Sequence, residues 1–282
     1  MPGLFAGLEK FGLKADKLNV YEEKKKEEKK SGAAAAAAPE ATEKDYIFDK
    51  TFKCPCCDAE FHAKAVRAGK VKLAGTDTDL RPKYQQFDCN KYDAVVCPKC
   101  GYASIAKYFT YLGTAQCKLI KENITKAFKG IDESGDIYTY DNAIGRFKLA
   151  LVSTIVKRAK DSERAYTCLK LAWVLRGKRE SLPEDTPDRE NVIKQLEADE
   201  KEALENAYVG FDNAFSTENL PICGNLDEGA LMIILADLSR RIGKTEEAGR
   251  WISSILTSRT IKDNVKNKAR EIKEIIDSAK QQ

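Results

Sequence analysis

Two Cys-x-x-Cys pairs, Cys54 with Cys57 and Cys97 with Cys100, constrain this chain more than any other feature of its sequence. Each pair holds two thiolates at the spacing of a tight turn, whose backbone amides can point at sulfur. Soft thiolates select zinc among the abundant divalent ions, and four of them complete a tetrahedral shell. We therefore expect one zinc ion bound by these four cysteines. A filled shell leaves no position for water or substrate, so the expected role is structural.

Other assignments of the site stay open. Cys56 could replace Cys57 if the first turn shifted by one residue, and His62 or Cys89 could stand in for a cysteine. The 39 residues between Cys57 and Cys97 exceed the usual spacing of about 15 to 20, which lowers the specificity of the motif. A redox pair is a competing interpretation, but no thioredoxin-like βαβ pattern surrounds either pair. Iron and sulfur chemistry is a further alternative.

Residues 46–110 are predicted to form a small β-rich zinc ribbon. Short β-prone runs such as 92–96 alternate here with residues that favour turns. These turn residues are Gly69, Gly75, Asp77, Asp79, Pro82 and Asn90. A unit of this kind has little core of its own, so a bound zinc contributes on the order of 10 kcal/mol to its folding. Removing the metal should unfold it.

Amphipathic helices replace the strands from Thr110 onward, and we expect seven of them. Helix starts are indicated at Asp161, Asp188 and Asp227, and a helix end at Gly243. A small, large, small trio at offsets zero, four and seven recurs three times and suits close helix contacts. The trios are Ala143, Phe147 and Ala150; Ala207, Phe211 and Ala214; and Ala248, Ile252 and Ile255.

The third trio resembles half of a tetratricopeptide hairpin. It follows Met232, Leu235 and Ala236 across the turn 243–245. The trios start at residues 143, 207 and 248, steps of 64 and 41, which miss the period of about 34 residues of that repeat. We therefore predict an α+β, mainly α, fold, in which the ribbon is followed by an irregular tetratricopeptide-like helical domain over 111–282.

The N-terminal 45 residues have a different composition. Residues 1–20 contain Leu4, Phe5, Leu8 and Phe11 along one side of a short amphipathic segment. Residues 21–45 include nine consecutive charges and six alanines, a composition typical of a disordered linker. The first segment either docks on a partner's groove or a membrane surface, or folds back on the body of the protein.

The location is expected to be the cytoplasm. The sequence has neither the roughly 18 uninterrupted apolar residues of a membrane span nor the pattern of a signal peptide. Nine cysteines is an odd number, and Cys117, Cys168 and Cys223 stand singly within helical patterns, which suits a reducing compartment better than disulfides. The oligomeric state is not indicated by the sequence.

The net charge of +4 lies entirely around the cysteines. Lysines and arginines number 9, 11 and 28 in residues 1–45, 46–110 and 111–282, against 9, 7 and 28 acidic residues. Four thiolates and one Zn²⁺ contribute a charge of about minus two, so the ribbon falls to about +2. Nucleic-acid binding through its aromatic residues and lysines is therefore the weaker hypothesis. The single histidine, His62, cannot assemble a familiar hydrolytic triad, so we expect no enzyme.

The run Thr76 to Pro82 contains Asp77, Asp79 and Arg81, which could bind a ligand or a cation together with Arg67. More often such a run is a hydrogen-bonded turn whose charges satisfy each other. We favour this structural interpretation, because nothing nearby in the sequence supplies a nucleophile or a base.

One set of residues in the ribbon forms a recognisable pattern: Phe52 to Pro55, Phe61, Lys64, Val66, Arg67, Asp77 to Asp79, Pro82, Tyr84, Tyr92 and Val96 to Ala103. This pattern resembles a bacterial family of unknown function, number 2225. The similarity covers residues 46 to about 280. Asp58 departs from the family pattern, where a glycine usually follows the second cysteine and adopts a left-handed conformation. The resemblance implies a bacterial, cytoplasmic protein and brings no reaction with it.

The leading hypothesis from the sequence is a non-enzymatic interaction or scaffold protein. Zinc organises the ribbon, the ribbon packs against the first helix near residues 116–129, and the helical surface binds another protein. Leu4, Phe5, Leu8 and Phe11 would add a second contact. The alternative is a zinc-ribbon nucleic-acid-binding factor.

Overall fold

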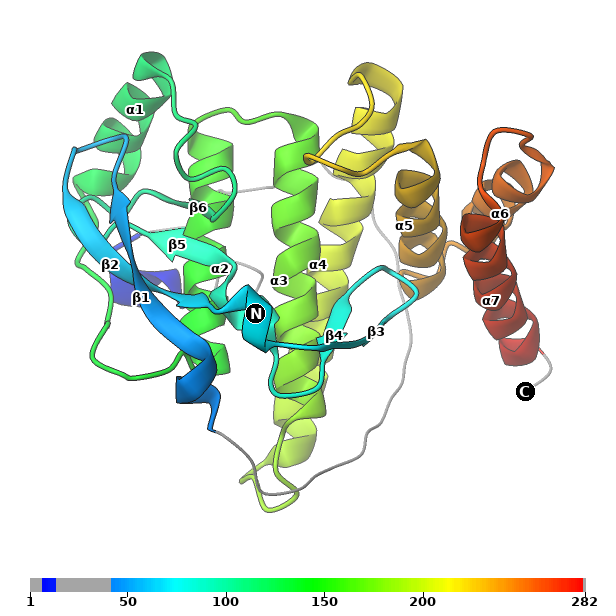
Figure 1. The fold of residues 1–282 in the computed structure, drawn as a ribbon, viewed down its shortest axis with the longest axis horizontal. Helices are drawn as coiled ribbons and strands as arrows, with labels where there is room; N and C mark the ends of the chain where they lie inside the picture. Colours follow the sequence, from blue (N-terminus) through cyan, green and yellow to red (C-terminus); the bar gives the residue numbers. More distant parts are fainter. Residues whose placement is uncertain (1–6, 14–41, 281–282) are drawn as a thin grey trace.

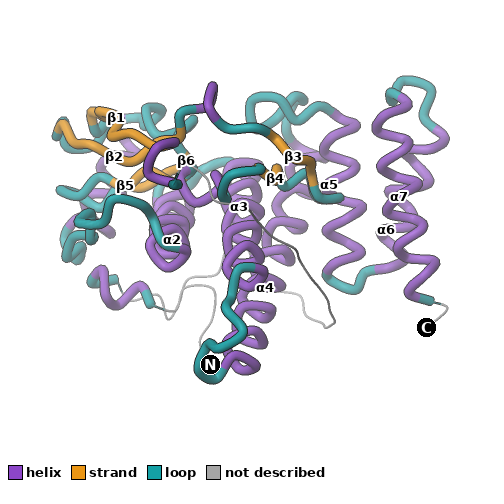
Figure 2. Tube along the Cα trace, turned by 60° about the horizontal axis from the view of Figure 1, so that its bottom comes forward, coloured by secondary structure: helices purple, strands orange, loops and turns teal. Residues whose placement is uncertain are grey.

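Seven α-helices stand side by side in a row, as predicted, and three strand pairs lie along one side of that row (Figure 1, Figure 2). This computed structural model describes residues 7–13 and 42–280. The helices are α1 (Thr114–Ile120), α2 (Tyr140–Val156), α3 (Asp161–Glu180), α4 (Arg189–Thr217), α5 (Glu228–Arg241), α6 (Thr245–Thr257) and α7 (Asp263–Ala279). The predicted α+β, mainly α, fold class is confirmed, whereas the likeness to tetratricopeptide repeats stays a prediction.

Each of the three small sheets is one antiparallel hairpin. The pairs are β1 (Ile47–Lys53) with β2 (Glu60–Val66), β3 (Leu73–Thr76) with β4 (Pro82–Tyr84), and β5 (Ala94–Val96) with β6 (Ala103–Ile105). The first and third hairpins carry the predicted cysteine turns at their tips. The second carries the run with Asp77, Asp79 and Arg81.

The core follows the predicted helix faces. All nine residues of the three trios, which lie on α2, α4 and α6, are buried. Residues four and seven positions apart lie on the same face of a helix, so each trio forms one buried stripe. The stripe of α2 is shared: Phe147 packs into the core of the helical row, while Leu149 and Ala150 pack beside the cysteine turns.

Two of the predicted helix ends are confirmed, and a third has an unexpected geometry. The Asp227 side chain accepts a hydrogen bond from the Ala230 amide at the start of α5. Gly243 follows the end of α5 with φ of 83°, a conformation that glycine adopts at little cost. Asp188 precedes α4 but is itself left-handed, and its carboxylate accepts from the Asn191 side chain rather than from a backbone amide.

The described part of the N-terminal segment folds back on the protein. The Phe11 carbonyl accepts a hydrogen bond from the Lys129 amide at 2.9 Å, and Leu13 is buried in the core that surrounds the cysteines. Gly12 has φ of +84°, and a Cβ there would lie 1.9 Å from the Ala127 carbonyl oxygen. The fold-back alternative thus describes residues 7–13, whereas Leu4, Phe5 and the side chain of Leu8 lie outside the described residues.

Residues 42–45, which were predicted to belong to the linker, lie against the ribbon. The Glu43 carboxylate accepts hydrogen bonds from Lys91 at 2.9 Å and from the Tyr92 hydroxyl at 2.5 Å. A carboxylate that joins two side chains of the ribbon positions the chain at the entry to β1. No helix of the described residues has the length and apolar character needed to cross a membrane.

Candidate metal centre

The two cysteine turns have the same backbone structure. In the first, the Asp58 amide donates to the Cys54 carbonyl at 3.0 Å, and in the second the Gly101 amide donates to the Cys97 carbonyl at 2.9 Å. Asp58 and Gly101 are both left-handed, with φ of 57° and 75°. Each turn joins the two strands of a hairpin, and the pairing of those strands therefore positions both cysteines of each pair.

The four predicted cysteines meet at one point. Their sulfur atoms all lie within 4.8 Å of one another, and Cys54–Cys100 and Cys57–Cys97 are each separated by 3.6 Å. Four ligands at about 2.3 Å from a tetrahedral zinc ion would lie about 3.8 Å apart. Cys54 and Cys97 have no exposed surface. The cluster therefore fits a metal ion with a complete sulfur shell.

The comparisons with known proteins identify the family. Residues 47–276 match a family described as "Uncharacterized protein conserved in bacteria (DUF2225)". The chain belongs to this family. No curated protein and no solved structure matches the DUF2225 chain, so no relative supplies a reaction or a partner.

The charge of the sulfur cluster favours a cation. Contacts with the thiols of Cys100 and Cys54 lower the pKa of Cys97, so one thiolate is well stabilised. Contacts with Cys54 and Cys97, together with burial, raise the pKa of Cys100, which opposes further ionisation. A bound dication removes this opposition, because it stabilises every thiolate in contact with it. The donor set in the DUF2225 chain therefore suits a soft metal ion such as zinc.

The alternative ligands lie away from the cluster. The Cys56 thiol contacts Cys117 instead, with 3.1 Å between the two sulfur atoms. His62 is exposed on β2, where its Nδ1 lies 3.3 Å from the Thr51 hydroxyl. Cys89 is buried beside the Phe87 carbonyl. In the described residues, the structure thus brings together the four cysteines of the first assignment, and that they bind metal stays a prediction.

The metal centre of the DUF2225 chain rests on α1 and on the π turn Lys121–Thr125 that follows it. The Thr125 hydroxyl donates to the Cys100 carbonyl at 2.9 Å. A Cβ on Gly101 would lie 2.6 Å from the Phe128 ring, so this glycine allows the turn to approach the helix. The predicted contact between the ribbon and residues 116–129 is confirmed.

Four aromatic residues form the other side of the centre. Phe109 contacts Phe52, Phe61 and Tyr102, with ring centroids 5.1 to 5.8 Å apart. Phe109 and Tyr102 have no exposed surface, and Phe61 is buried. These rings fill the space between β1, β2 and β6, and they form much of the apolar core of the ribbon.

The run at the tip of the β3–β4 hairpin forms a buried charge cluster with the helices. Asp79 has no exposed surface and accepts hydrogen bonds from Arg176 at 2.7 Å and from the Trp173 indole at 3.2 Å. Arg176 also donates to Glu200 on α4 at 2.7 Å, and Arg241 on α5 lies 3.8 Å from Asp79. One turn of the hairpin is therefore joined to α3 and α5, and through Arg176 to α4 (Figure 1).

The neighbours of Asp79 extend the same cluster. Asp77 pairs with Arg81 at 2.8 Å, and Arg81 also pairs with Glu180 at the end of α3. The Thr78 hydroxyl donates to Asp237 on α5 at 2.8 Å. The structural interpretation of the run is supported, but most of its partners lie about a hundred residues away instead of beside it. Arg67, the other predicted partner, donates to the Ile47 carbonyl.

Asp79 and Asp77 stay ionised because cationic side chains surround them. Burial alone would raise the pKa of Asp79, but Arg176 and Arg241 lower it far below its ordinary value. The pKa of Asp77 is also lowered: Lys83, Arg81 and Arg176 outweigh the effect of its burial. Buried ions of both signs thus compensate one another, as buried charges must.

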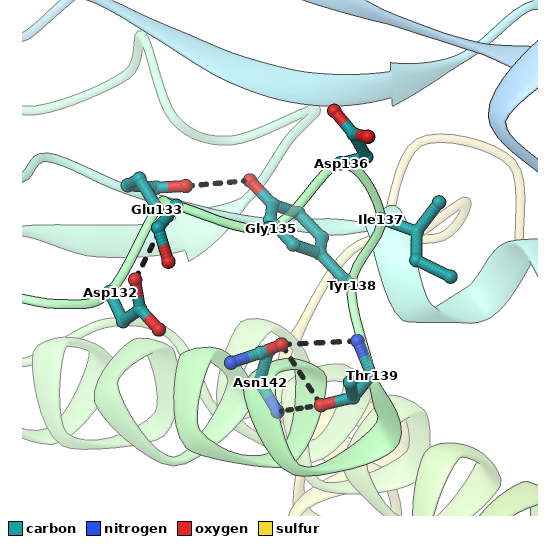
Figure 3. A pocket seen from close by; sticks show the side chains of 9 residues that line it. Asp132, Glu133, Gly135, Asp136, Ile137, Tyr138, Thr139 and Asn142 are labelled. Carbon is teal, nitrogen blue, oxygen red and sulfur yellow. Dashed lines mark hydrogen bonds between the residues drawn. The ribbon is translucent and has the colours of Figure 1, made fainter.

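An acidic loop before α2 lines a surface hollow of about 400 Å³ (Figure 3). Its acidic groups already have partners. Asp132 accepts from the Ser134 amide, Glu133 pairs with Arg146 at 2.6 Å, and Asp136 pairs with Lys44 at 2.6 Å. The acidic side chains of this loop are therefore paired within the protein, and the loop adds no candidate site.

Proposed function

We propose that this DUF2225 protein is a non-enzymatic interaction or scaffold protein, in which one structural zinc ion bound by Cys54, Cys57, Cys97 and Cys100 organises the ribbon. The observation that carries the proposal is the closed four-sulfur cluster, with all sulfur atoms within 4.8 Å of one another. Zinc in such a shell has no open position for water or substrate. The ion then stabilises the fold and performs no chemistry.

The way in which the hairpins contact the helices supports the proposal of protein binding. The metal centre and the Asp79 cluster both attach hairpins to the row of helices, and the buried charges at the tip of the second hairpin serve internal contacts. The row of helices offers its outer faces to a partner, as helical arrays commonly do. We propose a protein as that partner.

The nucleic-acid alternative has weaker support. Base stacking requires exposed aromatic rings. Tyr102 and Phe109 have no exposed surface, and Phe61 packs between Phe52 and Phe109. The small positive charge of the ribbon also predicts a shallow salt dependence.

Metal content tests the first part of the proposal. Purified, reduced full-length protein is expected to contain one zinc ion per chain, measured by inductively coupled plasma mass spectrometry. Cys54→Ser and Cys97→Ser should each lose most of it, because three ligands remain. His62→Ala and Cys89→Ser are matched controls, since these two residues were alternative ligands and lie outside the cluster; both should retain full metal. Reduced protein without metal but with a folded ribbon would overturn the proposal.

Partner capture tests the second part. Full-length protein should recover a specific protein from a native bacterial extract, and Cys97→Ser should recover less because its ribbon no longer folds. A salt-titrated binding assay with DNA and RNA distinguishes the alternative. Affinity above nonspecific background at physiological salt, with no protein recovered, would favour the nucleic-acid-binding factor.

A further inference from the structure

A second pair of cysteines lies beside the metal centre. Cys56 is located in the first turn, between the two ligands Cys54 and Cys57, and Cys117 lies on α1. Their sulfur atoms are 3.1 Å apart, although the two residues are 61 positions apart in sequence. The Cys117 thiol also lies 3.1 Å from the Cys56 carbonyl oxygen, and the Cys56 thiol lies 3.6 Å from the Cys117 carbonyl oxygen.

This arrangement is close to that of a disulfide. A disulfide bond is about 2.05 Å long, so the two sulfur atoms need to approach by about 1 Å. The backbone already holds them there from both sides. On one side the metal turn positions Cys56, and on the other the Thr125–Cys100 hydrogen bond holds the helical segment of Cys117 against the ribbon. Both thiols are free in the structure.

The two thiols differ in access. Cys117 is half-buried, whereas Cys56 is 2 % exposed. An oxidant dissolved in water can therefore reach Cys117 first, and Cys56 is the thiol in contact with it. This division into an accessible thiol and a resolving thiol is the arrangement found in cysteine pairs that oxidise reversibly.

We propose that Cys56 and Cys117 are an oxidation site that forms a reversible disulfide on reaction with hydroperoxides. The Cys117 sulfur attacks the peroxide, the O–O bond breaks, and a sulfenic acid and one molecule of water or alcohol form. The Cys56 sulfur then attacks the sulfenic sulfur, the S–S bond forms, and the oxygen leaves as water. Two thiols lose two electrons and two protons, and the hydroperoxide gains them.

The consequence is a covalent link between the metal turn and α1. Neither cysteine belongs to the four-sulfur cluster, so the link forms without the removal of a metal ligand. It closes a loop that contains β2, the β3–β4 hairpin, and the second metal turn. Oxidation would therefore fasten the ribbon to the helices without dismantling the metal centre.

Peptide mapping after oxidation tests this proposal. Reduced, metal-loaded full-length protein is treated with one equivalent of hydrogen peroxide, the remaining thiols are alkylated, and tryptic peptides are separated without reduction. The expected main product joins peptide 54–64 to peptide 108–118, with fragmentation that places the bond at Cys56. Metal content of the same sample should stay near its initial value, and dithiothreitol should reverse the link.

Variants separate this site from the metal centre. Cys117→Ser should abolish the link and retain metal; because this residue is half-buried, the substitution is expected to leave the fold intact. Cys56→Ser should give the same result, and Cys89→Ser should leave the link unchanged. Loss of metal together with bonds among Cys54, Cys57, Cys97 and Cys100 before any Cys56–Cys117 link would overturn the proposal. So would an unlinked pair after full consumption of the peroxide.

Failure here is distinguishable from failure of the proposed function. The metal content of the reduced starting sample tests the zinc site, and the linked peptide tests the thiol pair.

Discussion

Asp58 and Gly101 occupy the same place in the two cysteine turns, yet their surroundings differ. Both have positive φ, which costs a non-glycine residue about 1 kcal/mol. At Gly101 the Phe128 ring also fills the space that a Cβ would need, whereas the Asp58 side chain is exposed and only pairs with Lys53 at 3.5 Å. Position 101 therefore requires glycine because a Cβ has no space there. At position 58 a glycine would only remove the conformational cost of positive φ.

Asp58→Gly is expected to stabilise the metal-loaded protein by up to about 1 kcal/mol, because the exposed ion pair that it removes contributes little. Gly101→Ala should destabilise it by about 2 kcal/mol or more through both φ and overpacking. Urea unfolding with saturating zinc measures both. A loss of stability in Asp58→Gly would mean that the Asp58 carboxylate contributes more than its exposure implies.

Asp79 is the residue whose charge matters most to the contact between hairpin and helices. Asp79→Asn would remove one compensating charge from the buried Arg176 and the half-buried Arg241, and breaking a buried pair in this way typically costs about 3 to 5 kcal/mol. Asp49→Asn is the matched control, because Asp49 forms an exposed pair with Lys64 at 3.4 Å. It should change the free energy of unfolding by less than about 0.5 kcal/mol. Similar values for the two variants would contradict this view of the cluster.

At the scale of elements, two different kinds of contact attach the hairpins of the ribbon region to the helices. The first and third hairpins meet at the sulfur cluster and rest on α1 and α2. The second hairpin is attached by ion pairs to α3 and α5, and Arg176 of α3 links the same cluster to Glu200 of α4. The N-terminal segment is attached by a backbone hydrogen bond and two apolar side chains. Removing one of these sets of contacts should therefore affect one part of the molecule.

Metal removal is expected to loosen the first and third hairpins and spare the distant helices. The core between α5, α6 and α7 contains no residue of the first or third hairpin; Leu80, at the tip of the second hairpin, packs against it. Hydrogen exchange after chelation under reducing conditions should show faster exchange in residues 47–66 and 94–105, and unchanged exchange in α6 and α7. Equal loss of protection along the whole chain would show that the metal centre is needed by every helix.

Residues of the N-terminal segment should contribute to stability. Phe11→Ala removes a half-buried ring that packs against Gly145 of α2, and we expect a loss of about 1 to 2 kcal/mol in urea unfolding. Glu9→Ala, at an exposed position of the same segment, is the control and should have little effect. Unchanged stability in Phe11→Ala would favour the interpretation in which this segment docks on another molecule.

The whole molecule should respond to acid in two stages. Thiolates must be deprotonated to bind metal, so acidification first releases the ion. The Asp79 and Asp77 carboxylates have lowered pKa values in the folded state. Their contribution is therefore complete above the ordinary Asp pKa of about 3.9 and is lost as the pH falls below it. A metal-binding dye and far-ultraviolet circular dichroism should record metal release at higher pH than helix loss. Simultaneous transitions would contradict this separation.

Local patterns were enough to predict the metal centre and the helices. The spacing Cys-x-x-Cys defines a turn through contacts within six residues, and the trios define a buried stripe through the helical period. Both properties depend on neighbours along the chain. The two cysteine turns and the seven helices of the described residues could therefore be predicted without knowledge of the fold, whereas the left-handed conformation at Asp58 was implied by the resemblance to the family.

The partners of Asp79, the docking of Phe11, and the meeting of Cys56 with Cys117 needed the tertiary structure. Each of these contacts joins residues more than sixty positions apart, and many pairings of similar charge or size are compatible with the same sequence. Hydrophobic periodicity indicates which face of a helix is buried, but it does not indicate which hairpin covers that face. Packing of the whole chain decided which helices receive the charged run: Asp79 pairs with Arg176 of α3 and Arg241 of α5, where charges of both signs compensate one another.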